Sequence, residues 1–215
     1  AAKAGAAAHQ RTTRSSRAPR RRARGSGAKC VLEGRRSGGS EVVAALRVAR
    51  FEFAYMAERR AGTGRKPPPR AEKLMPEYRA AIASLGAATP LVIGGKSMGG
   101  RVASMIADEY FARGEIAGLL CLGYPFHPPA KPEQLRTAHL LELRTPTLIC
   151  QGTRDPFGTS EEVAGYALSP AIEIRWLEDG DHDLKPRRAV VGITAADHRA
   201  TMAAKVRDWV DRLSA

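Results

Sequence analysis

Cysteine is scarce in this chain of 215 residues, which contains only Cys30, Cys121 and Cys150. Three cysteines at irregular spacing exclude a disulfide framework and a cysteine-based zinc site. Cys121 and Cys150 lie in apolar runs, where a small buried thiol is expected. The cysteine usage therefore favours a reducing, cytoplasmic compartment.

Long hydrophobic runs are also missing. The longest apolar stretch, residues 116–124, is interrupted by two glycines and is much shorter than the roughly 18 residues that a membrane-spanning helix needs. No hydrophobic segment of a secretory signal peptide precedes it. We therefore expect no membrane partner.

Acidic residues are nearly absent from the first 40 positions, which contain one acid, Glu33, and eleven lysines and arginines. This segment therefore carries +10 of the total net charge of +13. It has few large apolar residues and cannot offset the entropy cost of ordering. The sequence predicts a disordered basic tail over residues 1–40. Three interpretations stay open for it: an organelle transit peptide, a nucleic-acid-binding arm, or a stretch without selected function. Nucleic acid is expected only as a non-specific partner of this tail.

The remaining residues, 41–215, have the pattern of one α/β domain. Short apolar runs bounded by glycine, proline or polar turns predict strands, and helical spacing predicts helices between them. The expected strands are residues 47–53, 91–94, 118–123, 147–150 and 172–177; the expected helices are residues 72–85, 98–110, 161–166 and 197–213. This alternation is typical of a mostly parallel sheet.

A Gly-x-Ser-x-Gly pattern, Gly95-Lys96-Ser97-Met98-Gly99, joins the expected strand 91–94 to the following helix. This is the context of a nucleophile elbow, in which the glycines allow a tight turn that raises the serine hydroxyl above the sheet edge. The N–H of Met98 would then lie beside it as an oxyanion donor. A glycine-rich turn before a helix can also hold a phosphate, but the spacing is not that of a P-loop.

Two further turns follow in an informative order. Asp155 comes after the expected strand 147–150, and His182 comes after the expected strand 172–177. Ser, Asp and His in this chain order, each after a strand, predict a catalytic triad of Ser97, Asp155 and His182. The neighbouring acids Asp179, Asp181 and Asp183 are expected to form a solvated turn.

At these residues the chain resembles the α/β-hydrolase superfamily, within it the dienelactone-hydrolase-like group. It is most similar to the small hydrolase-like family shared with the testis-expressed hydrolase-like protein and subunit three of the NSL complex. Five stretches carry the resemblance, residues 50–56, 94–101, 122–129, 148–158 and 179–186. The resemblance implies an open, mostly parallel sheet with helices on both faces, reduced or missing N-terminal strands, the same triad, and neither a cofactor nor a metal.

One part of the superfamily pattern is missing. The strand before residues 47–53 should end in a His-Gly-Ala-Gly-like loop that supplies a second oxyanion donor, and the only candidate is His9, which glycines do not follow. Residues 1–40 contain no convincing strand, so residues 47–53 are expected at an exposed sheet edge. Two hypotheses therefore stay open: a serine hydrolase of small esters, thioesters or lactones, and a non-catalytic hydrolase-like interaction module.

Four other residues lie near the predicted site. Tyr55 and His127 each follow a strand and are candidates for lining a substrate pocket, although the four prolines near His127 also fit a residue of a rigid loop. Lys96 and Arg101 flank the serine, where their charge would attract an anionic substrate. We predict Tyr55, Lys96 and His127 as substrate-binding residues. Only about 23 residues separate 123 from 147, which leaves no room for a large cap domain and favours a small acyl substrate.

Overall fold

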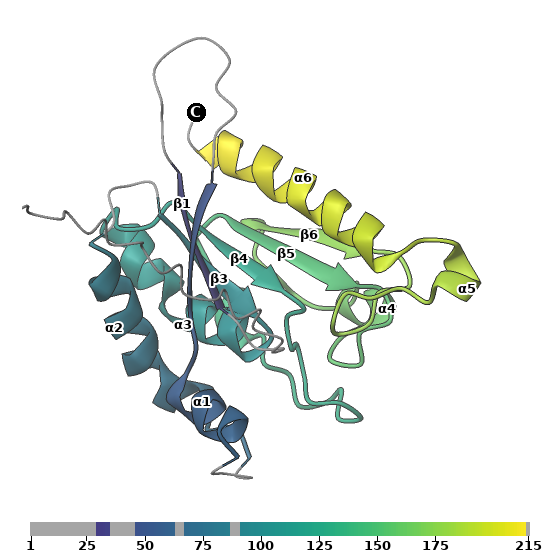
Figure 1. Cartoon of the computed structure of the whole chain (residues 1–215), viewed down its shortest axis with the longest axis horizontal. Helices are drawn as coiled ribbons and strands as arrows, with labels where there is room; N and C mark the ends of the chain where they lie inside the picture. Colours follow the sequence, from purple (N-terminus) through teal and green to yellow (C-terminus); the bar gives the residue numbers. More distant parts are fainter. Residues whose placement is uncertain (1–28, 35–45, 63–66, 87–90, 214–215) are drawn as a thin grey trace, which may run out of the picture.

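Six strands form one sheet in the computed structural model, which describes residues 29–34, 46–62, 67–86 and 91–213 (Figure 1). The strand order is β2-β1-β3-β4-β5-β6. Neighbouring strands from β3 to β6 are parallel, and β1 is antiparallel to both β2 and β3. The strands are β1 Lys29–Gly34, β2 Leu46–Phe51, β3 Leu91–Lys96, β4 Gly118–Leu122, β5 Thr147–Gly152 and β6 Ile172–Leu177.

Helices cover both faces of this sheet. They are α1 Ala54–Arg60, α2 Met75–Leu85, α3 Met98–Ala112, α4 Ser160–Val163, α5 Arg188–Val191 and α6 Ala195–Leu213, with short 3-10 turns η1 Ala71–Leu74 and η2 Ala138–Leu140. Figure 1 shows α6 along one side of the sheet and α2 and α3 on the other. The α/β-hydrolase fold predicted from the sequence is confirmed.

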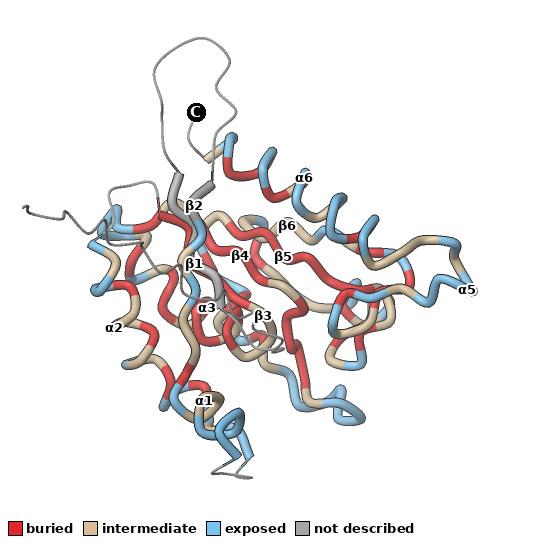
Figure 2. The backbone as a smooth tube through the Cα atoms, in the orientation of Figure 1, coloured by how far each residue is buried: buried red, intermediate tan, exposed pale blue. Residues whose placement is uncertain are grey.

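The central strands are apolar on both faces because helices pack against each face. Alternate residues of β3 point to opposite cores: Ile93 packs with the α2 and α3 side chains, and Val92 packs with those of α6. Leu119 and Leu120 of β4 divide in the same way. Figure 2 shows the resulting buried backbone at the centre of the sheet.

The N-terminal part of the sheet differs from the sequence prediction. Strand β1, Lys29–Gly34, lies within the range assigned to the tail, and it pairs with β2 along its whole length and with β3 at two positions. The short run Cys30-Val31-Leu32 was overlooked because glycine, arginine and serine surround it. As predicted, β2 lies at the sheet edge, where Val48 is 49% exposed. The rest of the predicted tail, with His9, lies outside the described residues.

Two helices, α1 and α4, differ from the sequence prediction. Helix α1 was missed because none of its residues is buried, so it has no apolar stripe to detect. Helix α4 is shorter than the predicted 161–166 and begins at a capping box between Thr159 and Glu162. No helix among the described residues is long and apolar enough to cross a membrane.

Candidate active site

Ser97 stands in the turn between β3 and α3 with a strained backbone. Its φ is 52° and its ψ is −122°, a combination that costs a non-glycine residue about 1–3 kcal/mol. The glycines around it allow this turn: a Cβ on Gly95 would lie 2.9 Å from the Gly99 carbonyl carbon, and one on Gly100 would lie 2.8 Å from the Gly95 oxygen. The structure therefore has the tight strand-to-helix turn that the Gly-x-Ser-x-Gly pattern predicts.

The structure brings Ser97, His182 and Asp155 together in one hydrogen-bonded chain. His182 Nε2 lies 2.8 Å from Ser97 Oγ, and His182 Nδ1 lies 2.9 Å from Asp155 Oδ2. The three residues follow the carboxyl ends of β3, β6 and β5, which meet at one edge of the sheet. With Nδ1–H donated to the carboxylate, Nε2 is free to accept the serine proton.

Asp155 is fully buried and is held by groups that donate to it. Gln151 Nε2 donates to Oδ2 over 3.0 Å, and the N–H of Phe157 donates to Oδ1 over 2.9 Å. Gln151 is itself fixed because its Oε1 accepts the Tyr124 N–H over 2.7 Å. The Phe157 ring lies 4.2 Å from the His182 ring, centroid to centroid. These contacts fix the carboxylate on the Nδ1 side of the imidazole.

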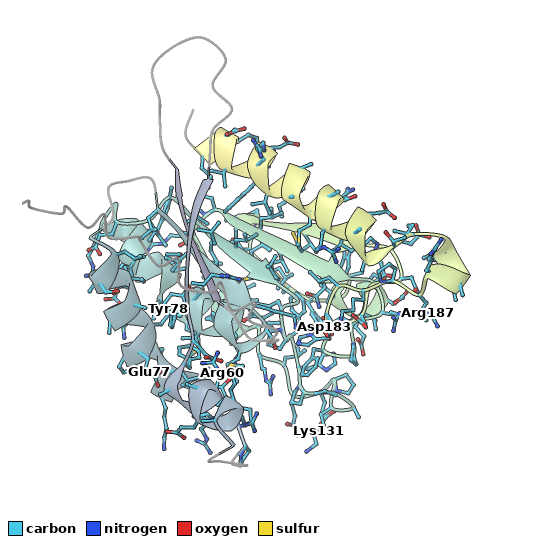
Figure 3. The ribbon with its side chains drawn as sticks, viewed as in Figure 1. Arg60, Glu77, Tyr78, Lys131, Asp183 and Arg187 are labelled. Carbon is cyan, nitrogen blue, oxygen red and sulfur yellow. The ribbon has the colours of Figure 1, made fainter. Side chains whose placement is uncertain are left out.

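The turn that carries His182 is anchored by Asp179, which has a positive φ of 53°. Its carboxylate accepts the Arg187 N–H over 2.5 Å and the Arg187 Nε–H over 2.9 Å, and these bonds hold the pKa of Asp179 down at about 2. Arg187, which directly precedes α5, is labelled in Figure 3. Asp179 is only 8% exposed. The prediction that this acid belongs to a solvated turn is therefore wrong.

A pocket of about 410 Å³ opens beside Ser97 and His182. Tyr55 and Lys96 line it, as predicted for substrate-binding residues, and so does Met98. Met98 begins α3, and the N–H groups of a first helical turn have no intrahelical acceptor. Lys96 Nζ lies 2.7 Å from Asp183 Oδ1, so its charge is already partly neutralised (Asp183 is labelled in Figure 3).

The structure places His127 elsewhere and corrects its assignment to substrate binding. The residue is only 2% exposed, and it is not among the described residues that line the pocket. Its Nδ1 lies 2.8 Å from the Pro128 carbonyl oxygen, and its Nε2 lies 3.4 Å from Glu162 Oε2. Its burial and these two contacts make His127 a packing residue of this loop.

A second serine–histidine pair, Ser104 and His139, has a different environment. Ser104 Oγ lies 2.8 Å from His139 Nε2, but Ser104 is 3% exposed inside the regular helix α3, and its hydroxyl also donates to the Arg101 carbonyl. Burial and the nearby Arg101 charge lower the pKa of His139, and no carboxylate accepts from its ring in the described part of the chain. This pair is an internal support of the fold.

No group of three or more His, Cys, Asp or Glu residues within the described ranges could hold a metal ion.

The sequence of this chain matches one known protein family over most of its length. Residues 23–211 match the family model described as "Alpha/beta hydrolase domain". The chain belongs to this family.

Two solved structures are similar to this family member. The esterase domain of a Rhodothermus marinus protein is 20% identical, with 64% of this chain and 68% of that chain covered and a TM-score of 0.47. An alpha-beta serine hydrolase homologue from Coxiella burnetii is 16% identical, with 56% and 57% covered and a TM-score of 0.42. The chain thus spans less than two thirds of the second structure.

Two supporting residues of this α/β-hydrolase site were not found from the sequence. Gln151 is a polar residue at the end of an apolar strand, and Tyr78 lies in the helix before the elbow strand, 16 residues from Gly94. The Tyr78 hydroxyl donates to the Gly94 carbonyl over 2.6 Å and accepts the Gly94 N–H over 2.8 Å. The only signal for either was a polar atom in an expected core position, which requires a partner.

Proposed function

We propose that this protein is a serine hydrolase that cleaves a small ester, thioester or lactone through an acyl-enzyme. The observation that carries the proposal is the chain of hydrogen bonds from Ser97 Oγ through the His182 ring to the buried Asp155 carboxylate. A hydroxyl, an imidazole and a carboxylate at these distances are the parts of a nucleophilic acyl-transfer site.

The chemistry follows from the placement of each group. As Ser97 Oγ bonds to the acyl carbon, His182 Nε2 takes the hydroxyl proton, and Asp155 stabilises the resulting imidazolium. The negative charge passes to the carbonyl oxygen, and we assign the Met98 N–H, in the first turn of α3, as its hydrogen-bond donor. Collapse breaks the bond to the leaving alcohol or thiol, which receives the proton from His182. Water then attacks the acyl carbon while His182 Nε2 takes its proton, and collapse breaks the bond to Ser97 Oγ, which recovers the proton from His182 as the carboxylic acid is released.

The pocket sets the size of the acyl group. Its volume of about 410 Å³ and its lining by Tyr55, Met98 and Phe157 suit a compact acyl chain with some apolar surface. The matching sequence stretches support a place for this protein in the dienelactone-hydrolase-like group of the superfamily. Within that group they favour the branch that includes NSL complex subunit three. A small acyl molecule is therefore the proposed substrate and partner.

A fluorophosphonate probe tests the proposal directly, because it forms a covalent bond only with an activated serine. We expect labelling at Ser97, identified by peptide mass spectrometry, and no labelling of Ser97→Ala. The matched control is Ser104→Ala, which removes the other histidine-bonded serine and should be labelled like the unchanged protein. An unlabelled but folded protein would contradict the enzyme proposal and favour a non-catalytic interaction module.

A further inference from the structure

A second, basic pocket adjoins the pocket of Ser97. It has a volume of about 530 Å³ and is lined by three arginines, Arg70, Arg101 and Arg136, against a single acid, Glu72. It shares Pro68, Met98 and Arg136 with the first pocket. The two pockets therefore meet at the residue whose N–H would face the reacting carbonyl.

The positive charge of this pocket is poorly compensated. Among the described residues, Arg101 forms one ion pair, and it is a weak one: Nη2 lies 3.8 Å from Glu72 Oε1, and the Glu72 side chain is 56% exposed. Arg101 Nε is buried without any hydrogen-bond partner in the described part of the chain. No carboxylate within the described ranges forms an ion pair with Arg136. A buried guanidinium N–H without an acceptor is unfavourable, and an anion beside Arg101 would supply that acceptor.

The positive charges of Arg101 and Arg136 also repel each other. Partial burial, followed by the nearby Arg101 charge, lowers the pKa of Arg136. Like charges that are brought together out of water lose hydration and repel, and an anion between them offsets both costs. Lys96 in the neighbouring pocket differs, because Asp183 already pairs with it.

We propose that the arginine pocket formed by Arg70, Arg101 and Arg136 binds a phosphate group carried by the substrate, next to the acyl bond that Ser97 attacks. That the phosphate belongs to a substrate of Ser97 rests on the proposed function. That the arginine pocket binds a phosphate group rests on the geometry of the pocket alone. Three guanidinium groups against one carboxylate leave an excess of two positive charges, which matches a phosphate monoester of about −1.5 to −2. A single carboxylate would leave one guanidinium uncompensated. Planar guanidinium donors also fit phosphate oxygens in pairs.

The first experiment measures equilibrium binding to Ser97→Ala, so it does not depend on activity. Phenyl phosphate and benzoate are titrated at pH 8 by calorimetry. We expect phenyl phosphate to bind at least about tenfold more tightly than benzoate, and Arg136→Gln to weaken phenyl phosphate binding about 10- to 100-fold. Arg136→Lys should restore part of the loss. Arg207→Gln, an exposed arginine on α6, should change nothing.

Two outcomes would overturn the assignment. Equal binding of phenyl phosphate to the Arg136→Gln and Arg207→Gln proteins would exclude the arginine pocket as the site, and tighter binding of benzoate would exclude phosphate as the ligand. If Arg136→Gln does not fold, the exposed Arg70 provides the same test, with a smaller expected loss of about threefold to tenfold for Arg70→Gln.

The activity of the unchanged protein separates this inference from the proposed function. Hydrolysis of the neutral ester 4-nitrophenyl acetate, inhibited competitively by phenyl phosphate, would support both. Hydrolysis by a protein whose Ser97→Ala variant shows no binding of phenyl phosphate in the calorimeter would refute the phosphate site alone. Binding of phenyl phosphate by a protein that hydrolyses nothing would refute the proposed function alone.

Discussion

Asp155 shows how single side chains prepare this site. Its carboxylate has no exposure, and donors from Gln151, Phe157 and His182 surround it. An amide in its place would keep the shape but could donate to Nδ1, which would favour the wrong imidazole tautomer. We therefore expect Asp155→Asn to lower kcat on a short acyl ester by roughly 10³–10⁴ with little change in KM.

The measurement is steady-state hydrolysis near pH 8, with folding checked by circular dichroism. The control is Asp208→Asn, an exposed acid on α6, which should keep full activity. A loss smaller than tenfold in Asp155→Asn would show that this carboxylate does not orient His182 during the reaction.

Asp179 gives a prediction about pH. Its pKa is held at about 2 by the hydrogen bonds from Arg187, whereas an unfolded aspartate titrates near 3.9. A lowered pKa in the folded state stabilises the protein above the unfolded value, and this contribution disappears as the pH falls through the folded value. The unchanged protein should therefore exceed Asp179→Asn in free energy of unfolding at pH 5, and the difference should shrink between pH 4 and pH 2.

Urea unfolding of both proteins at pH 5, 4, 3 and 2 measures this difference. The comparison cancels the acids that the two proteins share. A gap that stays constant over the whole series would mean that the ion pair with Arg187 does not set the pKa of Asp179.

At this scale the sequence predicted three residues that the structure brings together in one hydrogen-bonded chain, but not the residues that support them. Ser97, Asp155 and His182 were found because their order along the chain and their positions after strands are constrained by the chemistry. The supporting roles of Gln151 and Asp179 depend on which polar atoms meet in three dimensions, and no spacing rule encodes that. The assignment of His127 failed for the same reason, since a position after a strand does not fix which way a loop folds.

At the level of elements, helix α2 completes the elbow strand. The registered pairs between β1 and β3 involve only Leu91 and Val92 of β3, and further along the strand the Tyr78 hydroxyl serves both the N–H and the carbonyl of Gly94. A buried peptide group that loses its partner costs about 1–3 kcal/mol. We expect Tyr78→Phe to lose this amount of unfolding free energy and to react more slowly with a fluorophosphonate, because the strand that positions Ser97 is loosened.

Denaturant unfolding and labelling rates test this prediction. Tyr166→Phe is the matched control, since this residue is partly exposed and its hydroxyl has no hydrogen bond within the described ranges. Its effect should stay within about 0.5 kcal/mol. Equal stability of the two variants would show that another group takes over at Gly94.

The elements that sequence patterns located are those with a clear apolar run or an apolar helical stripe. Strands β3 to β6 were predicted to within two residues at their ends because apolar runs between turns have few alternatives. Strand β1 and helix α1 were missed because the first is a short run in a glycine- and arginine-rich context and the second has no buried residue. Their positions are decided by the neighbouring strands and helices, which a local pattern does not contain.

On the scale of the whole molecule, the sheet separates two cores of unequal size. The larger core lies under α2 and α3, and the smaller core lies under α6, where Val206, Trp209 and Val210 are at most 9% exposed. Trp209 fits here because β4 begins with Gly118, where an added Cβ would lie 2.8 Å from the Trp209 ring. The smaller core thus depends on one aromatic side chain that fills the space over a glycine.

Trp209→Ala should therefore cost about 3–5 kcal/mol of unfolding free energy, a large share of the roughly 5–15 kcal/mol that stabilises a typical domain. Because α6 covers β5 and β6, whose ends carry Asp155 and His182, we also expect fluorophosphonate labelling to be lost at lower denaturant concentrations than in the unchanged protein. Unfolding in urea, followed by fluorescence and by labelling, measures both effects, with the exposed Arg207→Ala as control. A loss below about 1 kcal/mol would mean that the sheet holds its shape without α6, and the site would then depend on the larger core alone.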